Sequence, residues 1–379
     1  MSDIFDGTCS VFIFIYMKKI EKSDIKELFE AVKKEYSVVA PTLKDKVIGL
    51  DFITDINQIP SGFVETEKKN SYRAEKGSDR FFSYSRPYLP FKRFLIPPEF
   101  TFMKIKKENS QLTFEEVFSE EKIALFDIRP CDLKGLQILD DVFITKNPHP
   151  DSYYRKVREN LFIVAVTCFS PTENCFCSSM GISLKPENGY DILITEMKDS
   201  FLIRAGSEKG RRILDSLTGR EVSQEDLAEE EKALKETEKM IIRSVNTDSL
   251  PQILYSQIES KQWEEVGSRC LACTSCTQVC PTCFCFNIVE KNSPDGSYSE
   301  RIRIYDSCFS PEFATVHRFN IRQSIASRYR QWLMHKFAYW TDQFGSYGCV
   351  GCGRCITWCP AGIDITEEIK SLRGEIDKS

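Results

Sequence analysis

The chain has 379 residues, a formal net charge of −5 at pH 7 and 16 cysteines. The charge gives no general attraction to nucleic acid, and no run of about 20 apolar residues could cross a bilayer, so we expect no direct membrane insertion. The start of the chain has no charged and apolar leader, which argues against a secreted disulfide framework. The cysteines therefore favour metal thiolates in a protein of the reducing cytoplasm.

The first predicted elements lie near the N-terminus. Val11–Met17 is a short strand-like run. Residues 22–35 carry apolar side chains at helical spacing, which predicts an amphipathic helix with Ser23 as its N-cap. The apolar positions are Ile25, Leu28, Phe29 and Val32. Val47–Phe52 then predicts a strand.

The next segments predict an α/β arrangement. Ile123–Ile128 and Leu161–Thr167 are apolar runs typical of buried strands, and Leu133–Phe143 predicts a short helix after the first of them. Asp191–Glu196 and Phe201–Arg204 can pair as a hairpin. Together these elements predict a mixed sheet over roughly the first 220 residues.

A charge-rich segment follows. Residues 223–242 are dense in Glu and Lys, which predicts a solvent-facing helix that bridges two domains. We therefore expect an α+β fold, with an α/β domain at 1–222, a charged helical linker at 223–250 and a mainly helical domain at 251–379.

Within the last domain, Phe309–Gln343 predicts two or three aromatic helical segments. Their basic side chains predict either a docking face for an acidic partner or, as the favoured interpretation, a solvated helix face; they are Arg318, Arg322, Arg328, Arg330, His335 and Lys336.

Two matching cysteine runs carry the strongest functional signal. They are Cys270-x2-Cys273-x2-Cys276-x3-Cys280-Pro281 and Cys349-x2-Cys352-x2-Cys355-x3-Cys359-Pro360. In each run three closely spaced thiolates can bind three corners of a cubane iron–sulfur cluster, while the fourth, before proline, reaches the other cluster. The spacing predicts two [4Fe-4S] clusters. The first ligand set is Cys270, Cys273, Cys276 and Cys359, and the second ligand set is Cys349, Cys352, Cys355 and Cys280.

Zinc is the alternative for cysteines at these spacings. It needs only two C-x2-C pairs, so it explains neither the third regularly spaced cysteine nor the proline. The runs begin 79 residues apart, at Cys270 and Cys349. The intervening segment must therefore fold by itself, unlike the short link of a minimal ferredoxin.

Residues beside the ligands suggest how the clusters are tuned. Gly351 and Gly353 permit tight turns whose amides can approach cluster sulfur. Arg269 and Arg354 either raise a cluster potential or are exposed surface arginines.

Four further cysteines, the upstream set, lie outside the two runs: Cys131, Cys168, Cys175 and Cys177. Two of them directly follow the two best strand candidates, and the carboxyl ends of neighbouring strands form the crevice where cofactors bind in α/β sheets. If the strands are neighbours, the loop Phe169–Gly181 can bring the other two over the same point. The pattern favours a third iron–sulfur cluster, with buried unliganded cysteines or a zinc site as alternatives. Asp132 could bind or orient a ligand, but we expect it to cap the helix that starts at Leu133.

Four cysteines remain: Cys9, Cys283, Cys285 and Cys308. The last three are one ligand short of a cluster, which His317 could complete. We expect them instead to pack beside the ferredoxin runs, because cysteine is readily buried.

Several motifs together resemble a known family. They are Arg129-Pro-Cys-Asp132, Thr172-Glu-Asn-Cys-Phe-Cys-Ser-Ser-Met-Gly181, Cys280-Pro-Thr-Cys-Phe-Cys285, Tyr305-Asp-Ser-Cys308 and Cys349-Val-Gly-Cys-Gly-Arg-Cys355. From about residue 24 to 370 the chain is similar to the iron–sulfur subunits of two related complexes, the beta subunit of cytoplasmic NiFe sulfhydrogenase and the A subunit of anaerobic sulfite reductase. Residues 172–181 look closer to the sulfite reductase form, and Asp151–Arg158 looks closer to the hydrogenase form.

The resemblance implies an electron-transfer subunit of an anaerobic redox complex, placed between a flavin- and NAD(P)-binding partner and a catalytic partner. It also implies that the upstream set binds a third Fe–S cluster. The chain has neither G-x-G-x-x-G after a strand nor a G-x4-G-K-[ST] loop, so electrons must enter and leave through partners. The competing hypothesis is a catalytic reductase of sulfur species that acts at the upstream cluster.

Overall fold

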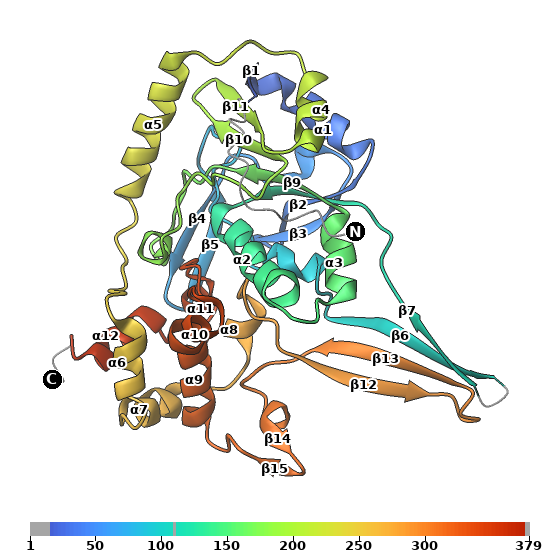
Figure 1. Ribbon diagram of the computed structural model, residues 1–379. Helices are drawn as coiled ribbons and strands as arrows, with labels where there is room; N and C mark the ends of the chain where they lie inside the picture. Colours follow the sequence, from blue (N-terminus) through green and yellow to red (C-terminus); the bar gives the residue numbers. More distant parts are fainter. Residues whose placement is uncertain (1–15, 109–110, 376–379) are drawn as a thin grey trace.

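The computed structural model describes residues 16–108 and 111–375, and a seven-stranded mixed sheet lies at its centre (Figure 1). In spatial order the strands are β1 (Met17–Glu21), β11 (Ser200–Ala205), β10 (Ile192–Glu196), β9 (Leu161–Val166), β8 (Ile123–Ile128), β2 (Ser37–Lys44) and β3 (Val47–Ile53). Strands β10, β9, β8 and β2 run parallel, and the others pair antiparallel at both edges. The α+β class with a mixed N-terminal sheet is confirmed, as is the β10–β11 hairpin. Cys9 and most of the strand expected at 11–17 lie outside the described residues.

Helices cover both faces of this sheet. Alternate residues of β8 face opposite layers, with Ala124 and Phe126 in one core and Ile123 and Leu125 in the other. Helices α1 (Ile25–Lys33) and α4 (Glu208–Asp215) pack on the first core, and α2 (Pro130–Asp140) and α3 (Ser152–Glu159) pack on the second. Because both faces are covered, β8 and β9 are buried over their whole length.

Two helix starts differ from the prediction. Ser23 lies in a short 3-10 turn, Lys22–Asp24, and donates to the Asp24 carboxylate, so it does not cap α1. Helix α2 begins at Pro130, a residue whose fixed φ suits the first helical position. Asp132 is therefore inside the first turn and is not its cap.

A second, four-stranded sheet joins segments far apart in the chain and forms a long arm (Figure 1). It has the order β12 (Phe286–Asn292), β13 (Tyr298–Tyr305), β6 (Glu99–Glu108) and β7 (Gln111–Glu116). Two smaller hairpins are β4 (Phe63–Lys68) with β5 (Ser71–Lys76), and β14 (Thr315–Val316) with β15 (Phe319–Asn320). The part after residue 251 thus contains strands that the helical pattern did not predict.

The charged segment forms α5 (Gln224–Glu238), which begins with a capping box of Ser223 and Asp226. Three of its residues depart from the expected solvent-facing helix, because Asp226, Glu230 and Thr237 are buried. Glu230 forms an ion pair with Arg204 of β11. The remaining helices are α6 (Leu250–Ser256), α7 (Gln262–Arg269), α8 (Ser275–Gln278), α9 (Ile325–Met334), α10 (Trp340–Phe344), α11 (Arg354–Thr357) and α12 (Ile365–Arg373). Most of them surround a third apolar core.

The basic segment within this part was only partly predicted. Helical structure is confined to α9, a π-helical turn at His335–Tyr339 and α10, apart from a 3-10 turn at Glu312–Ala314. Arg328 and Lys336, expected on a solvated face, are buried. No helix among the described residues is long and apolar enough to span a membrane.

Candidate iron–sulfur sites

The first ligand set lines a mainly apolar cavity. All four cysteines contact it, together with Cys355 and side chains that include Phe309, Tyr329, Trp332, Ile363 and Ile365. Helix α8 carries Cys276 at the wall, and Ala272 and Thr274 lie in left-handed turns between the ligands. The Ala272 N–H donates to Cys270 Sγ at 3.4 Å. Hydrogen bonds of this kind favour thiolate sulfur and tune an iron–sulfur centre.

The second ligand set repeats this local geometry. Gly351 and Gly353 take the left-handed positions, the Gly351 N–H donates to Cys349 Sγ at 3.4 Å, and α11 carries Cys355. The fourth member, Cys280, lies close enough to the three other cysteines for its charge to contribute to the raised thiol pKa of each. For Cys349, burial is the main cause and raises the pKa to about 12. Iron binding would offset this cost by holding the sulfur as thiolate.

A buried lysine contacts the second set. Lys336 Nζ donates to Cys280 Sγ at 3.1 Å and also to Thr282 Oγ1 at 3.1 Å. Sequence reasoning placed this ammonium group on a solvated face. In the fold it supplies positive charge next to a thiolate ligand.

The upstream set gathers at the carboxyl ends of β8 and β9, which are neighbours. Cys131 lies in the first turn of α2, Cys168 follows β9, and the other two lie in the loop over the crevice. Within this set the charges of Cys168 and Cys175 both raise the pKa of Cys177, after burial, its main cause, to above its usual range. Cys131 packs against the apolar cluster that contains Cys352, and Cys175 Sγ lies 4.0 Å from the Cys352 carbonyl oxygen, so the upstream set borders the second set.

The loop that carries Cys175 and Cys177 packs directly on the second run. The Phe176 N–H donates to the Gly351 carbonyl at 2.8 Å. A Cβ at Gly351 would lie 2.6 Å from the Phe176 carbonyl carbon, so only glycine permits this approach.

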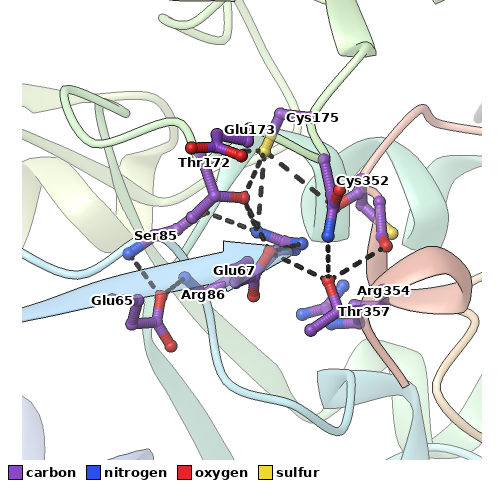
Figure 2. Close-up of polar contacts among 12 residues, drawn as sticks. Glu65, Glu67, Ser85, Arg86, Thr172, Glu173, Cys175, Cys352, Arg354 and Thr357 are labelled. Atoms are coloured by element: carbon purple, nitrogen blue, oxygen red, sulfur yellow. Dashed lines mark hydrogen bonds and ion pairs between the residues drawn. The ribbon is translucent and has the colours of Figure 1, made fainter. Parts of the chain in front are cut away.

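Arg86 is the main charged group at this junction (Figure 2). Its Nη1 lies 3.6 Å from Cys175 Sγ, and its Nη2 donates to Glu67 at 2.8 Å. Glu67 also accepts from Thr172 at 2.6 Å and from Thr357 of α11 at 3.1 Å. The network therefore joins β4, the cysteine loop and the second run.

A second buried arginine borders the upstream set. Arg129 forms an ion pair with Asp127, whose φ of 65° marks a bulge at the end of β8, and it lies near Cys168. Arg86 Nε and Arg129 Nη1 are buried and have no hydrogen-bond partner among the described residues. Unpartnered guanidinium N–H groups beside four thiols fit an anionic four-thiolate cluster.

A buried ion pair fastens the second run to the helix that carries Cys131. Arg354 of α11 donates to both carboxylate oxygens of Asp132 at 2.7 Å, and its Nε donates to the Pro87 carbonyl. Arg354 is therefore not an exposed arginine. Arg269 is partly exposed and pairs with Glu265 and Glu368.

We also looked at whether the side chains could bind a single metal ion instead of a cluster. Within residues 16–108 and 111–375, no group of three or more Cys, His, Asp or Glu side chains is placed to hold one ion.

Cys283, Cys285 and Cys308 lie close to Cys280 of the second set. Cys283 and Cys308 are buried and Cys285 is half-buried, whereas His317 is exposed next to β14. Contacts with Cys308 are the largest cause of a Cys285 pKa lowered to about 7.

Sequence reasoning missed Arg86, Glu67 and the buried Lys92. Arg86 lies in the polar, aromatic-rich stretch that begins at Arg80, which has no helical or strand periodicity. A charged residue in such a stretch gives no sequence signal that distinguishes it from an exposed one.

Comparison with known proteins agrees with the cysteine pattern. A family model described as a 4Fe-4S dicluster domain matches residues 269–363, which contain both runs. The sulfhydrogenase 2 subunit beta of Pyrococcus furiosus is 33% identical over 331 residues, covering 85% of this chain and 95% of that protein. No solved structure matches the chain. The chain carries a 4Fe-4S dicluster domain and belongs to the family of sulfhydrogenase beta subunits.

Proposed function

We propose that the chain is a cytoplasmic iron–sulfur subunit that relays electrons between a flavin- and NAD(P)-binding partner and a catalytic partner of NiFe hydrogenase or sulfite reductase type. The similar Pyrococcus protein is named as a subunit of a sulfhydrogenase, which supports assembly into a hetero-oligomer and favours the hydrogenase type. The absence of a nucleotide-binding motif from the sequence supports electron entry through a partner.

We propose three [4Fe-4S] clusters, one at each ligand set and one at the upstream set. Bound clusters supply one-electron carriers whose potentials depend on hydrogen bonds, charge and burial. The protein contributes the four thiols of each set, backbone N–H groups directed at sulfur, and the buried cations Arg86, Arg129 and Lys336.

The observation that carries the proposal is that the three sets follow one another in a row, with the first set at one end, the second set in the middle and the upstream set at the other end. Arg86 Nη1 lies 3.6 Å from Cys175 Sγ of the upstream set, and the charge of Cys352 in the second set contributes to the raised pKa of Arg86, so the guanidinium lies close to both sets. Cys276 of the first set lies near Cys280 and Cys355 of the second. The row therefore supports a route with the second set in the middle.

The outer end of this row lies near the surface. Cys273 is exposed, and its neighbour Leu271 is 65% exposed. An exposed apolar side chain beside a ligand suits contact with an electron-transfer partner, because short-lived redox encounters use small interfaces. We propose that one partner docks over this end.

Reconstitution with partners tests the relay. The isolated subunit should not oxidise NADH, whereas addition of the flavoprotein partner should reduce its clusters. Oxidation of NADH by the isolated chain would disprove the requirement for a partner. Co-purified nickel would identify a hydrogenase partner, and sirohaem a sulfite reductase partner.

The alternative function is catalysis on sulfur species at the upstream set. It would require an open iron, and four candidate thiolates argue against one. Turnover of a sulfur substrate by the purified chain with an artificial reductant, abolished in Cys175→Ser, would favour the alternative.

A further inference from the structure

One buried lysine joins the two parts of the chain that form the second ligand set. Lys336 Nζ donates to Cys280 Sγ and to Thr282 Oγ1, each at 3.1 Å, and to a third acceptor, the Gly348 carbonyl, at 3.2 Å. The Gly348 N–H in turn donates to the Lys336 carbonyl at 2.8 Å. Cys280 comes from the first run, and Gly348 directly precedes Cys349 of the second run. The lysine therefore bridges both runs at the second set.

The surrounding contacts also fix the charge state of this lysine. The Thr282 hydroxyl donates to the Gly348 carbonyl at 2.7 Å, so its oxygen accepts from Lys336. Carbonyl, hydroxyl and thiolate are then three acceptors, and only the charged ammonium form has three N–H groups to donate. Lys336 is 3% exposed and lies in the π-helical turn His335–Tyr339, a kind of turn that is frequent at functional sites. A buried positive charge is therefore held at one ligand sulfur.

The cations beside the upstream set are arranged differently. Three arginines border that set, and each forms an ion pair with a carboxylate group. The pairs are Arg86–Glu67, Arg129–Asp127 and Arg354–Asp132. Each carboxylate offsets part of the positive charge that reaches the cluster position.

The first set also has carboxylates beside its cations. Arg269 directly precedes the first ligand, and Arg328 is buried on α9, the helix whose next residues line the cavity. Arg269 pairs with both Glu265 and Glu368. Two carboxylates thus accompany two arginines. One ligand of the set, Cys273, is exposed, so solvent and salt screen the charges around it.

The second set has positive charge without this compensation. None of the three acceptors that bind the Lys336 ammonium group is a carboxylate. A second buried lysine, Lys92, donates to Tyr305 Oη at 2.9 Å and to the Cys283 carbonyl, which are also uncharged partners. Buried charges are screened much less than exposed ones. Because each added electron makes a cluster more negative, uncompensated positive charge favours reduction of this centre most.

We infer that Lys336, acting through Cys280, makes the second centre the most easily reduced of the three, so that the first electron to enter the row rests in its middle. The step is the uptake of one electron from a redox partner by the cluster, and no bond forms or breaks. The inference rests on the proposed function, because it needs a bound cluster at each set. A reduced middle centre holds an electron next to both ends of the row. The chain would thus store one electron between its two partners.

A redox titration followed by electron paramagnetic resonance tests the role of Lys336. In Lys336→Gln the highest of the cluster potentials should fall by about 59 mV or more, a tenfold change in the reduction equilibrium for one electron, while the other potentials stay unchanged. Lys336→Arg keeps the charge and should keep the natural potential. The matched control is Arg330→Gln on the same helix, where the side chain is 33% exposed and donates to the Ile258 carbonyl; it should change no potential. An unchanged highest potential in Lys336→Gln, or a fall confined to a lower one, would overturn the inference.

A second variant separates the charge from its hydrogen-bonded surroundings. Thr282→Val keeps the cation and removes one of its acceptors, so it should lower the same potential by less than Lys336→Gln does. Iron and sulfide contents should equal those of the natural chain in every variant. A larger fall in Thr282→Val than in Lys336→Gln would assign the effect to the hydroxyl group and contradict the role of the lysine.

The order of reduction can be followed in the natural chain without a variant. After uptake of two electrons per chain, the two reduced centres should be neighbours, because the middle centre is filled first. Their resonance signals should then show magnetic interaction. Two signals without interaction would place both electrons at the ends of the row and overturn the inference. Failure of the proposed function would appear separately, as an iron content of the natural chain below that of three clusters.

Discussion

Arg354 and Asp132 form a fully buried, two-pronged ion pair, with both N–O distances at 2.7 Å and each side chain 1% exposed. One partner lies within the second cysteine run and the other follows Cys131 in α2. The pair therefore couples the position of the upstream set to that of the second set.

Replacement of Asp132 by Asn should be strongly destabilising. It leaves the Arg354 guanidinium without its buried carboxylate, and breaking such a pair costs about 3–5 kcal/mol in the free energy of unfolding. Anaerobic denaturant titration measures the loss. The exposed Arg301–Glu290 pair, 3.0 Å long, provides the control, and Glu290→Gln should change stability by less than about 1 kcal/mol. Similar effects of the two substitutions would refute the coupling role.

Substitution of Gly351 by Ala should displace the loop that carries Cys175 and Cys177. The residue has a φ of 62°, and the new Cβ would overlap the Phe176 backbone. Gly374 has a φ of 73° but open space around its Cβ position, so Gly374→Ala isolates the left-handed strain of about 1–2 kcal/mol. Gly351→Ala should lose iron as well as stability, and Gly374→Ala only stability. Full iron content in Gly351→Ala would show that this close packing is dispensable.

Neutralising Arg86 should lower the reduction potential of the upstream centre. Its guanidinium lies 3.6 Å from Cys175 Sγ, and loss of a positive charge makes electron addition less favourable. We expect a shift of tens of millivolts in Arg86→Gln, since about 59 mV corresponds to a tenfold change for one electron. Redox titration followed by electron paramagnetic resonance measures it. Arg301→Gln, on the distant β arm, should leave every potential unchanged. An unaltered potential in Arg86→Gln would place the upstream centre elsewhere.

Glu65 should make stability depend on pH. Burial, followed by the charge of Glu67, raises the pKa of Glu65 from 4.5 to about 7. The folded protein thus holds a proton that the unfolded chain releases, so this stabilisation is complete below about pH 4.5 and is lost as the pH rises to about 7. Glu65→Gln should lose less stability than the natural chain between about pH 5.5 and 7. The exposed Glu75→Gln should behave like the natural chain, and the same slope in all three proteins would contradict the burial effect.

The sequence predicted those features whose residues lie close together along the chain. The two cysteine runs are recognised from the short intervals between their cysteines, and β8 and β9 from apolar runs that end shortly before Cys131 and Cys168. Pairing of β6 with β13 could not be predicted, because these strands lie almost 200 residues apart and neither carries a signal for the other. Arg86 was missed, Lys336 was favoured on a solvated face, and Arg354 was left open between tuning a cluster and lying exposed, since periodicity assigns charged residues to solvent unless a buried partner is known. Their partners, such as Asp132 for Arg354, lie on segments that are distant in the sequence, so only the folded structure identifies them.

Iron and acid-labile sulfide counting on anaerobically purified protein tests the central claim most directly. Three cubane clusters predict about twelve iron atoms and about twelve sulfides per chain, falling to about eight of each in Cys131→Ser. About eight in the natural chain, unchanged by Cys131→Ser, would contradict a cluster at the upstream set, and a colourless protein without sulfide would contradict all three.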